Sequence, residues 1–374
     1  MAVNLESIKL GKVNLMFFKN VLTLMAGSSI AQALPIAISP ILTRIYTPDE
    51  FGIFALYLSI VTVISTVVTG RYELAILLPK KTEDANNILI MSILISFFVS
   101  FMLVLIVFKF DEKIIKLIGN PELKNWLYFI PLAIFLNGVY QNLICWNNRN
   151  KEYKRLAINN VIQSSTTATT NLGLGALGWG SGGLILGSVI GRSVVVLLLG
   201  KVVFKNINLS FNKTRKLKLL ALMRRYNEFP KINSLHALLN VFSTQLPFFL
   251  ISYFFYNTVT GFYALMNRVL MTPINIVSGS FGQVFFQEMS HLYVEKNTNE
   301  MIFFKKIMFR LLVWSLPFFV IFFIYSKDLF SFVFGENWSI TGEYAQILLP
   351  MLYLRFTGSV MSSVVIIYDE QKKH

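Results

Sequence analysis

The sequence predicts an all-α integral membrane protein, on three observations. Of its 374 residues, 55% are hydrophobic and 14% are charged, whereas a soluble domain carries about 25% charged residues. Apolar stretches of about 20 residues recur along the chain, the length that a helix needs to cross the hydrocarbon layer. Strands of a membrane barrel need only about 9 to 11 residues, so stretches of this length indicate helices. Lys and Arg residues are concentrated in every second connection between these stretches, as expected when successive connections lie on opposite sides of a membrane.

We expect about ten transmembrane helices from these stretches. They lie at residues 20–43, 51–75, 88–108, 127–146, 156–178, 180–204, 232–256, 260–286, 307–326 and 340–367. Tryptophans fall near several of the ends, where their amphipathic rings favour the headgroup layer. Residues 1–19 would precede the first helix on the cytoplasmic side.

Positive charge predicts that both termini are cytoplasmic. Lys and Arg are far more frequent in the connections on the side of the N-terminus, the side on which cytoplasmic loops concentrate them. The densest connection is 205–231, which contains KTRKLKLLALMRRY and is amphipathic enough to lie along the inner membrane surface. The opposite connections hold only Arg44, Lys109, Lys113, Lys116, Lys124 and Lys327.

Several classes of function are excluded by composition. The net charge of +15 follows membrane sidedness instead of forming one stripe, which argues against nucleic acid as a partner. Cys145 is the single cysteine, and the three histidines are far apart in sequence, so no metal site is expected. No paired nucleophile and base is placed for catalysis, and we expect neither an enzyme nor a bound cofactor.

The chain repeats itself weakly with a period near 210 residues. Leu34-Pro35 is echoed by Leu246-Pro247, and EFGIFALYLS from Glu50 is echoed by VTGFYALMNR from Val259. An even number of spans separates the copies, so they have the same orientation, and parallel repeats of this kind hold substrate between two halves. We expect a six-helix N-lobe at 20–204, a basic cytoplasmic linker at 205–231, and a C-lobe at 232–374.

The predicted C-lobe is incomplete, because it offers four helices where the first copy has six. The sequence stops at VVIIYDEQKKH, where a cytoplasmic loop would lead to an eleventh span. We interpret the chain as truncated relative to its architecture. A native protein of ten helices is the alternative.

Arginines inside the spans are the strongest functional signal. Arg192 and Arg355 lie near the middle of predicted spans and Arg268 about a third of the way down another. Each costs roughly 2.5 to 3.5 kcal/mol at the bilayer centre, so each should face protein or a water-filled cavity. The one acid near a span interior is Glu73, beside Arg71. Unmatched buried arginines predict an anionic partner, and the guanidinium fork suits phosphate.

Two polar or small-residue runs have competing interpretations. Gly183, Gly187 and Gly191 are spaced by four residues and predict a ridge for close helix packing. The run SSTTATTN from Ser164 to Asn171 can bond its own backbone or a neighbouring helix, and a role facing the substrate is the alternative.

A family resemblance rests on the first two spans. AGSSIAQALPIAISPILTRIYTPDEFGIFALYLSI, followed by GRYELAILLPKKTEDA, resembles the opening of the Wzx-type O-antigen and capsule repeat-unit flippases, within the superfamily of multidrug, oligosaccharidyl-lipid and polysaccharide exporters. The similarity is greatest over residues 20–110. Members usually have twelve or fourteen helices, so this chain lacks at least two helices of the usual pattern.

The resemblance implies two helical lobes, as in multidrug exporters of the MATE group, around a cationic cavity. It implies a flippase that carries undecaprenyl-pyrophosphate-linked oligosaccharide across the bacterial inner membrane for O-antigen, lipopolysaccharide or capsule synthesis. The polymerase machinery would be a further partner. Arg268, in MNRVLMTP, and Arg44, in TRIYTP, resemble arginines of the related lipid II flippases. We therefore expect Arg192, Arg268, Arg355 and Arg44 to bind substrate.

Two other functions compete with the flippase. A cation-coupled drug exporter of the same superfamily would need an acid deep in a span for cationic drugs, and none is evident. A membrane polysaccharide polymerase would need a large outer loop with clustered acids, but the connection from Lys109 to Asn125 is short and rich in lysine. Ion coupling would need a titratable site, for which Glu73 is the candidate.

Overall fold

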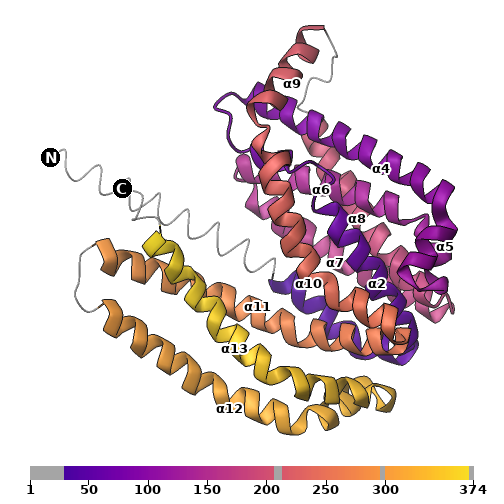
Figure 1. Ribbon diagram of the computed structural model, residues 1–374, viewed down its shortest axis with the longest axis vertical. Helices are drawn as coiled ribbons and strands as arrows, with labels where there is room; N and C mark the ends of the chain where they lie inside the picture. Colours follow the sequence, from indigo (N-terminus) through magenta and orange to yellow (C-terminus); the bar gives the residue numbers. More distant parts are fainter. Residues whose placement is uncertain (1–28, 206–212, 295–299, 370–374) are drawn as a thin grey trace. The chain divides into compact units, whose positions relative to one another are not determined.

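The regular secondary structure in the described part of the protein is helical, as predicted. The computed structural model describes the backbone of residues 29–205, 213–294 and 300–369, and the side chains of 29–205, 217–278 and 304–358. Within these ranges every predicted span overlaps a helix (Figure 1), and the span predicted at 51–75 is interrupted by a turn at residues 66–71. The predicted N-terminal segment 1–19 lies outside the described residues.

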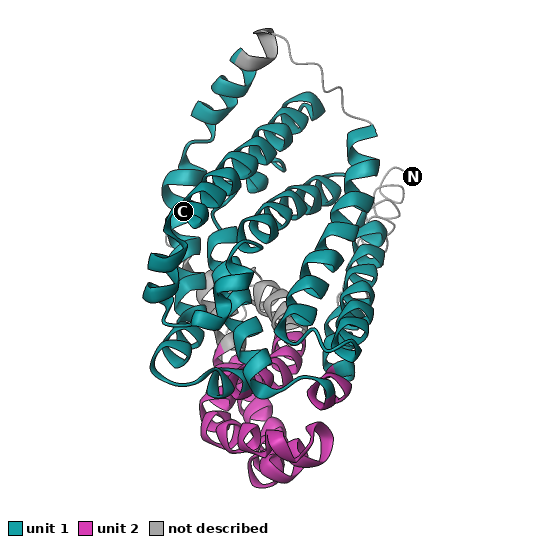
Figure 2. Ribbon diagram, turned by 90° about the vertical axis from the view of Figure 1, so that its right-hand side faces the viewer, with its two compact units in different colours: residues 1–38, 45–261 teal, residues 39–44, 262–374 magenta. Residues whose placement is uncertain are grey.

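The helices form two compact units, which Figure 2 distinguishes by colour. Unit 1 is residues 1–38 and 45–261, and unit 2 is residues 39–44 and 262–374. The helices that lie wholly in unit 1 are α2 (Pro48–Ser65), α3 (Tyr72–Ala75), α4 (Thr82–Ile118), η1 (Pro121–Leu123), α5 (Lys124–Leu127), α6 (Ile130–Arg149), α7 (Tyr153–Ala176), α8 (Ser181–Lys205), α9 (Lys213–Arg225), η2 (Phe229–Asn233) and α10 (Ser234–Phe254).

Unit 2 contains most of α11 (Asn257–Val294), together with α12 (Glu300–Phe334), η3 (Glu336–Trp338) and α13 (Ser339–Asp369). The first described helix, Ser29–Ile45, contributes its residues 39–44 to this unit. The unit boundary falls one helix later than the predicted boundary between lobes, because α10 packs against α2 in unit 1. The division into six-helix and four-helix lobes stays a prediction.

Five described helices are long and apolar enough to cross a membrane, or six if the bent pair Pro121–Leu127 and Ile130–Arg149 counts as one span. They are α2, α4, α8, α12 and the helical stretch Phe229–Phe254. Helix α7 falls outside this group since its hydroxyl and amide residues lower its hydropathy. The structure therefore confirms a multi-pass membrane bundle, and the count of ten stays a prediction.

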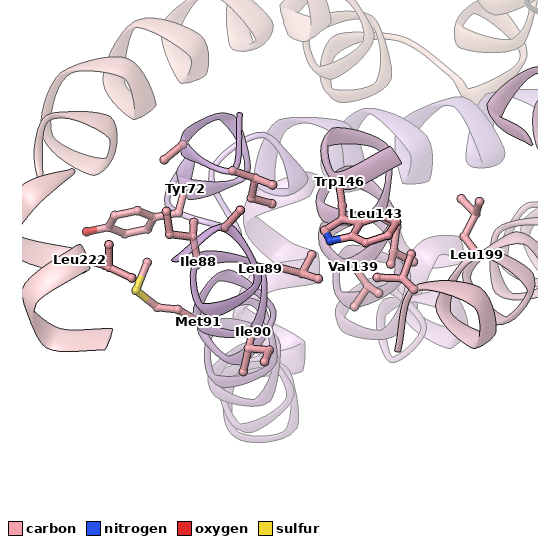
Figure 3. Packing of buried hydrophobic residues seen from close by; sticks show 14 of the residues in the cluster. Tyr72, Ile88, Leu89, Ile90, Met91, Val139, Leu143, Trp146, Leu199 and Leu222 are labelled. Atoms are coloured by element: carbon pink, nitrogen blue, oxygen red, sulfur yellow. The ribbon is translucent and has the colours of Figure 1, made fainter. Parts of the chain in front are cut away.

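A buried apolar cluster joins α3, α4, α6, α8 and α9 within unit 1. Figure 3 shows Ile88 and Leu89 of α4 in this cluster, with Val139 and Leu143 of α6. Leu222 of α9 is buried in the same cluster, so one face of the predicted linker packs against protein. These residues recur at helical spacing, which is why their faces meet.

Local chemistry sets where the second predicted span begins and ends. Thr47 and Glu50 form a capping box at the start of α2, with Pro48 in the first turn. The span was expected to run to residue 75, but α2 ends at Ser65. Residues 66–71 form a turn in which Gly70 and Arg71 both have φ near +60°, and α3 begins directly after them as a separate helix.

Helices α7 and α8 confirm the predicted glycine ridge. A Cβ at Gly187 would overlap the side chain of Asn171, and one at Gly191 would overlap Thr167. Thr167 and Asn171 belong to the Ser/Thr-rich run, so part of that run serves helix packing. The two helices can touch along their length because the ridge carries no side chains there.

Candidate functional site

Arg192 of α8 is held by two uncharged partners from neighbouring helices. Its Nη1 donates a hydrogen bond of 3.0 Å to Oε1 of Gln163 on α7. Its Cζ lies 4.0 Å from the centre of the Tyr140 ring on α6. The Tyr140 hydroxyl donates a 2.9 Å hydrogen bond to Oδ1 of Asn160, one helical turn from Gln163. The guanidinium is thus oriented by Gln163 and Tyr140, and neither side chain neutralises its charge.

Tyr140, Asn160 and Gln163 were not predicted from the sequence. The signal that could have found them is the density of amides and the tyrosine in spans expected to face lipid: VYQNL around Tyr140 and NNVIQ before the Ser/Thr-rich run. Polar groups inside a membrane face the bundle interior and pair with one another. An arginine on one span therefore predicts polar side chains on a neighbouring span that can contact it.

Arg268 of α11 lies in unit 2 and is partly buried. Its backbone carbonyl accepts a 2.8 Å hydrogen bond from the Thr272 hydroxyl, but its guanidinium has no hydrogen-bond or ion-pair partner among the described residues. An unpaired charge inside a membrane protein is retained where a cavity or a ligand can solvate it. The predicted role of Arg268 in binding an anion stays a prediction.

Arg355 and Arg44 have more open surroundings. Arg355 of α13 is exposed. Arg44 is exposed as well, and its Nη1 donates to the Pro40 carbonyl of its own helix at 3.1 Å. Arg44 thus already caps a helix end. These two arginines and Arg268 belong to unit 2 whereas Arg192 belongs to unit 1, and a cavity shared by all four stays a prediction.

Glu73 is the buried acid among the described side chains, with 3% of its surface exposed. The Thr69 hydroxyl donates to one carboxylate oxygen, and Arg71 Nη1 lies 3.4 Å from the other. The carboxylate is placed by the helix break at Gly70 and Arg71. Glu73 is therefore already paired within its own loop, and its role in ion coupling stays a prediction.

The segment RYELAILLP that carries the resemblance is fixed by an arginine of another helix. Arg149, at the end of α6, donates to the carbonyls of Ile76 at 3.1 Å, Leu77 at 3.3 Å and Pro79 at 2.6 Å. The bonds are charge-assisted and occupy carbonyls that α3 leaves unpaired. Arg149 was counted only as a cytoplasmic loop charge from the sequence. Arg149 therefore holds residues 71–79, the segment that contains Glu73 and that we call the Glu73 loop, in place.

The span arginines carry groups of the type that binds anions. No group of three or more metal-ligating residues is present among the residues that the structure describes. Arg192 and Arg268 present guanidinium groups without acidic partners in the described residues. A guanidinium binds phosphate oxygens through two parallel hydrogen bonds. A role of Arg192 and Arg268 in binding a phosphorylated ligand stays a prediction.

Comparison with known proteins places the chain in one family. Residues 41–341 match the family described as "Polysaccharide biosynthesis protein". The succinoglycan biosynthesis transport protein ExoT of Rhizobium meliloti (strain 1021) is 26% identical over 261 residues, which are 67% of this chain and 50% of ExoT. The chain thus spans about half the length of the curated relative that it matches.

Solved structures of multidrug resistance MATE family transporters of the MOP superfamily share the fold. An inward-facing one matches with a TM-score of 0.55 and 14% identity, over 94% of this chain and 82% of that chain. An outward-facing one matches with a TM-score of 0.50 and 14% identity, over 92% and 81%. At this identity the likeness concerns the fold alone, and it confirms the predicted MATE-like class.

Proposed function

The chain belongs to the polysaccharide biosynthesis protein family, and we propose that it is a flippase for an anionic, lipid-linked oligosaccharide. The substrate is the undecaprenyl-pyrophosphate-linked repeat unit of an O-antigen or capsule polysaccharide, moved from the inner to the outer leaflet of the bacterial inner membrane. The relatives above are transport proteins, in agreement with the expectation that the chain is not an enzyme.

The observation that supports this proposal is that two arginines in the predicted spans have no acidic partner among the described residues. Arg192 has only uncharged partners, and the Arg268 guanidinium has none in the described residues. Each charge would be costly unless water or an anion solvates it. The pyrophosphate supplies that anion during transport, and Arg355 and Arg44 add positive charge along its path.

The lipid and the sugars would be handled differently from the pyrophosphate. The lipid tail stays in the bilayer, while neutral sugars pass polar side chains such as the Ser/Thr-rich face of α7. Glu73 is our candidate for coupling transport to a cation, because a buried carboxylate beside Arg71 changes its pairing when it takes up a proton. In this proposal both termini lie in the cytoplasm, and a polysaccharide polymerase receives the product on the outer side.

The test follows lipid-linked repeat units in a strain whose own copy of the gene is deleted. We expect units to accumulate on the cytoplasmic face, to be inaccessible to a sugar-specific label in intact spheroplasts, and to become accessible when the gene is restored. Unchanged labelling in the deletion strain would disprove the flippase.

The same strain separates the two competing functions. Loss of a polymerase leaves single repeat units on the outer face, so accessible but unpolymerised units would indicate that function. Loss of a drug exporter raises susceptibility to cationic drugs and leaves polysaccharide unchanged. Orientation is tested with a Lys213→Cys variant lacking Cys145, which we expect an impermeant thiol reagent to leave unlabelled in intact cells.

A further inference from the structure

One side of α4 changes from apolar to basic toward its C-terminal end, which lies next to α5 (Figure 1). The apolar stripe on this side consists of the exposed residues Phe98, Met102 and Leu105. Lys109 is exposed and follows them at helical spacing, so it lies on the same face. Val107, on the opposite face of α4, is buried. The exposed side of α4 is therefore amphipathic along its length.

Three exposed lysines continue the apolar stripe, and we name them the lysine face: Lys109, Lys113 and Lys116. Their spacing of four and three residues places them on one side of the helix. None of them makes an ion pair among the residues that the structure describes. Like charges at this spacing repel one another. The lysine face is therefore destabilising unless an anion lies beside it.

The ring of Phe110 brings two of these charges together. Helix α4 is kinked at Phe110, whose φ of −128° and ψ of 21° are not helical. The Nζ atoms of Lys109 and Lys113 each lie 5.6 Å from the centre of this ring. A cation–π contact attracts an ammonium group without cancelling its charge. Phe110 therefore gathers two ammonium groups that would otherwise separate.

The two acids of this segment do not neutralise the lysine face. Asp111 accepts a hydrogen bond of 3.1 Å from the Tyr128 hydroxyl and one of 2.7 Å from the backbone N–H of Glu112. Glu112 is exposed, and no lysine of the described chain lies within ion-pair distance of its carboxylate. The three ammonium groups are therefore open to an anion from outside the protein.

The position of these lysines runs against the usual charge bias of membrane proteins. The predicted topology puts this end of α4 on the outer side, where lysine and arginine are depleted. Of the six such residues in the predicted outer connections, four lie at 109–124. Snorkelling to the headgroup layer explains Lys109 at the end of a span, but Lys113 and Lys116 lie beyond it. The cluster therefore points to a ligand.

We propose that the lysine face binds the pyrophosphate of the lipid carrier on the outer side after transport, while the lipid chain lies along the apolar stripe. The inference rests on the proposed function. Both phosphate groups of a pyrophosphate are charged, so it can contact several ammonium groups at once, whereas a phospholipid head such as phosphatidylglycerol offers a single phosphate. Lysine suits a site that releases its ligand, because a compact ammonium group lacks the fork of arginine.

A fluorescent reporter beside the lysine face tests this site by binding alone. Leu117 is 79% exposed, so a Leu117→Cys variant in a Cys145→Ala background accepts an environment-sensitive dye. The full chain is placed in nanodiscs of a zwitterionic lipid and titrated with undecaprenyl pyrophosphate. We expect a saturable change in dye emission. Replacing all three lysines of the lysine face by Gln should weaken the apparent affinity by at least about tenfold, because charge-assisted hydrogen bonds are lost.

The matched control removes three exposed lysines from the predicted inner side of the same unit. The substitutions are Lys80→Gln, Lys81→Gln and Lys154→Gln, which change the net charge equally and should leave the affinity unchanged. Phosphatidylglycerol at the same fraction should give no saturable response. The proposal is overturned by an equal loss of affinity in the control, by an equal response to phosphatidylglycerol, or by no response to undecaprenyl pyrophosphate.

Glu112 provides a change in the opposite direction. Glu112→Gln removes a negative charge from the segment and should tighten binding about two- to threefold, whereas Lys113→Glu should weaken it more than Lys113→Gln does. A merely structural role of these residues would not move the affinity in opposite directions. Shifts of the same sign in Glu112→Gln and Lys113→Glu would refute an electrostatic site.

These outcomes separate the lysine face from the flippase. Arg268→Ala should lower transport and leave the dye response intact, because Arg268 does not belong to α4. Loss of the dye response in Arg268→Ala would place the ligand elsewhere and overturn the proposal. A failed titration counts against the lysine face alone, whereas unchanged labelling in the deletion strain counts against the flippase.

Discussion

Arg192 and Arg268 are two span arginines in opposite circumstances. Arg192 in unit 1 is oriented by Gln163 and by the Tyr140 ring, whereas the Arg268 guanidinium in unit 2 has no partner among the described residues. Neutral partners fix a guanidinium in place without cancelling its charge. Both arginines can therefore attract an anion. The orientation of the Arg192 guanidinium depends on its neighbours, whereas that of Arg268 does not.

The largest effect is expected from removing the unpaired arginine. Arg268→Ala should lower repeat-unit transport by about a hundredfold, because two charge-assisted hydrogen bonds to a ligand are lost at about 1.5 kcal/mol or more each. Arg268→Lys should restore part of it, since it keeps the charge and loses the fork. Labelling of lipid-linked units measures both variants. Arg310→Ala, an exposed arginine of the same unit, is the control, and wild-type transport in Arg268→Ala would refute a ligand role.

Converting the neutral partner of Arg192 into an acid should have the next largest effect. Gln163→Glu places a carboxylate where the amide oxygen lies 3.0 Å from Nη1. The resulting ion pair cancels the charge offered to the substrate. We expect about a tenfold loss of transport with normal membrane insertion, measured by labelling and by immunoblot. If Gln163→Glu transports normally, Arg192 serves packing alone.

The aromatic support of Arg192 should matter in graded steps. Tyr140→Phe keeps the ring face and loses the hydroxyl bond to Asn160, so we expect a loss of a few-fold at most. Tyr140→Leu removes a cation–π contact of up to about 2 kcal/mol in a desolvated site, and should cost about tenfold. Equal losses of transport in the two variants would mean that the cation–π contact of the Tyr140 ring with Arg192 does not contribute to transport.

The smallest effect is expected at an exposed ion pair. Lys218 Nζ of α9 lies 2.7 Å from Glu83 Oε1, and this carboxylate raises the pKa of Lys218 above its usual value of 10.5. The stabilisation is therefore present below that pKa and is lost as pH rises through the higher value of the folded state. Solvent screens the pair, so Lys218→Ala should change neither transport nor the midpoint of thermal unfolding near pH 7. A large shift would show that α9 depends on this pair.

The sequence predicted the cations of the candidate site but not their surroundings. Arg192, Arg268 and Arg355 stand out because charge is rare in apolar spans. Tyr140 and Gln163 are 52 and 29 residues from Arg192 along the chain, on other helices, and helical periodicity does not say which helices become neighbours. Arg149 is a similar case: it reads as a loop charge, yet it binds three carbonyls of the Glu73 loop.

The sequence by itself determined the fold class and the positions of most helices. These follow from apolar length and from caps such as Thr47 and Glu50. Only the tertiary structure decided that α2 ends at Ser65 and that α10 packs with α2. It also decided that Gly52 lies against the Asn257 carbonyl and Gly261 against the Pro48 carbonyl. Helix formation in a membrane is dictated by backbone hydrogen bonds within one segment, whereas contacts between segments depend on which surfaces fit.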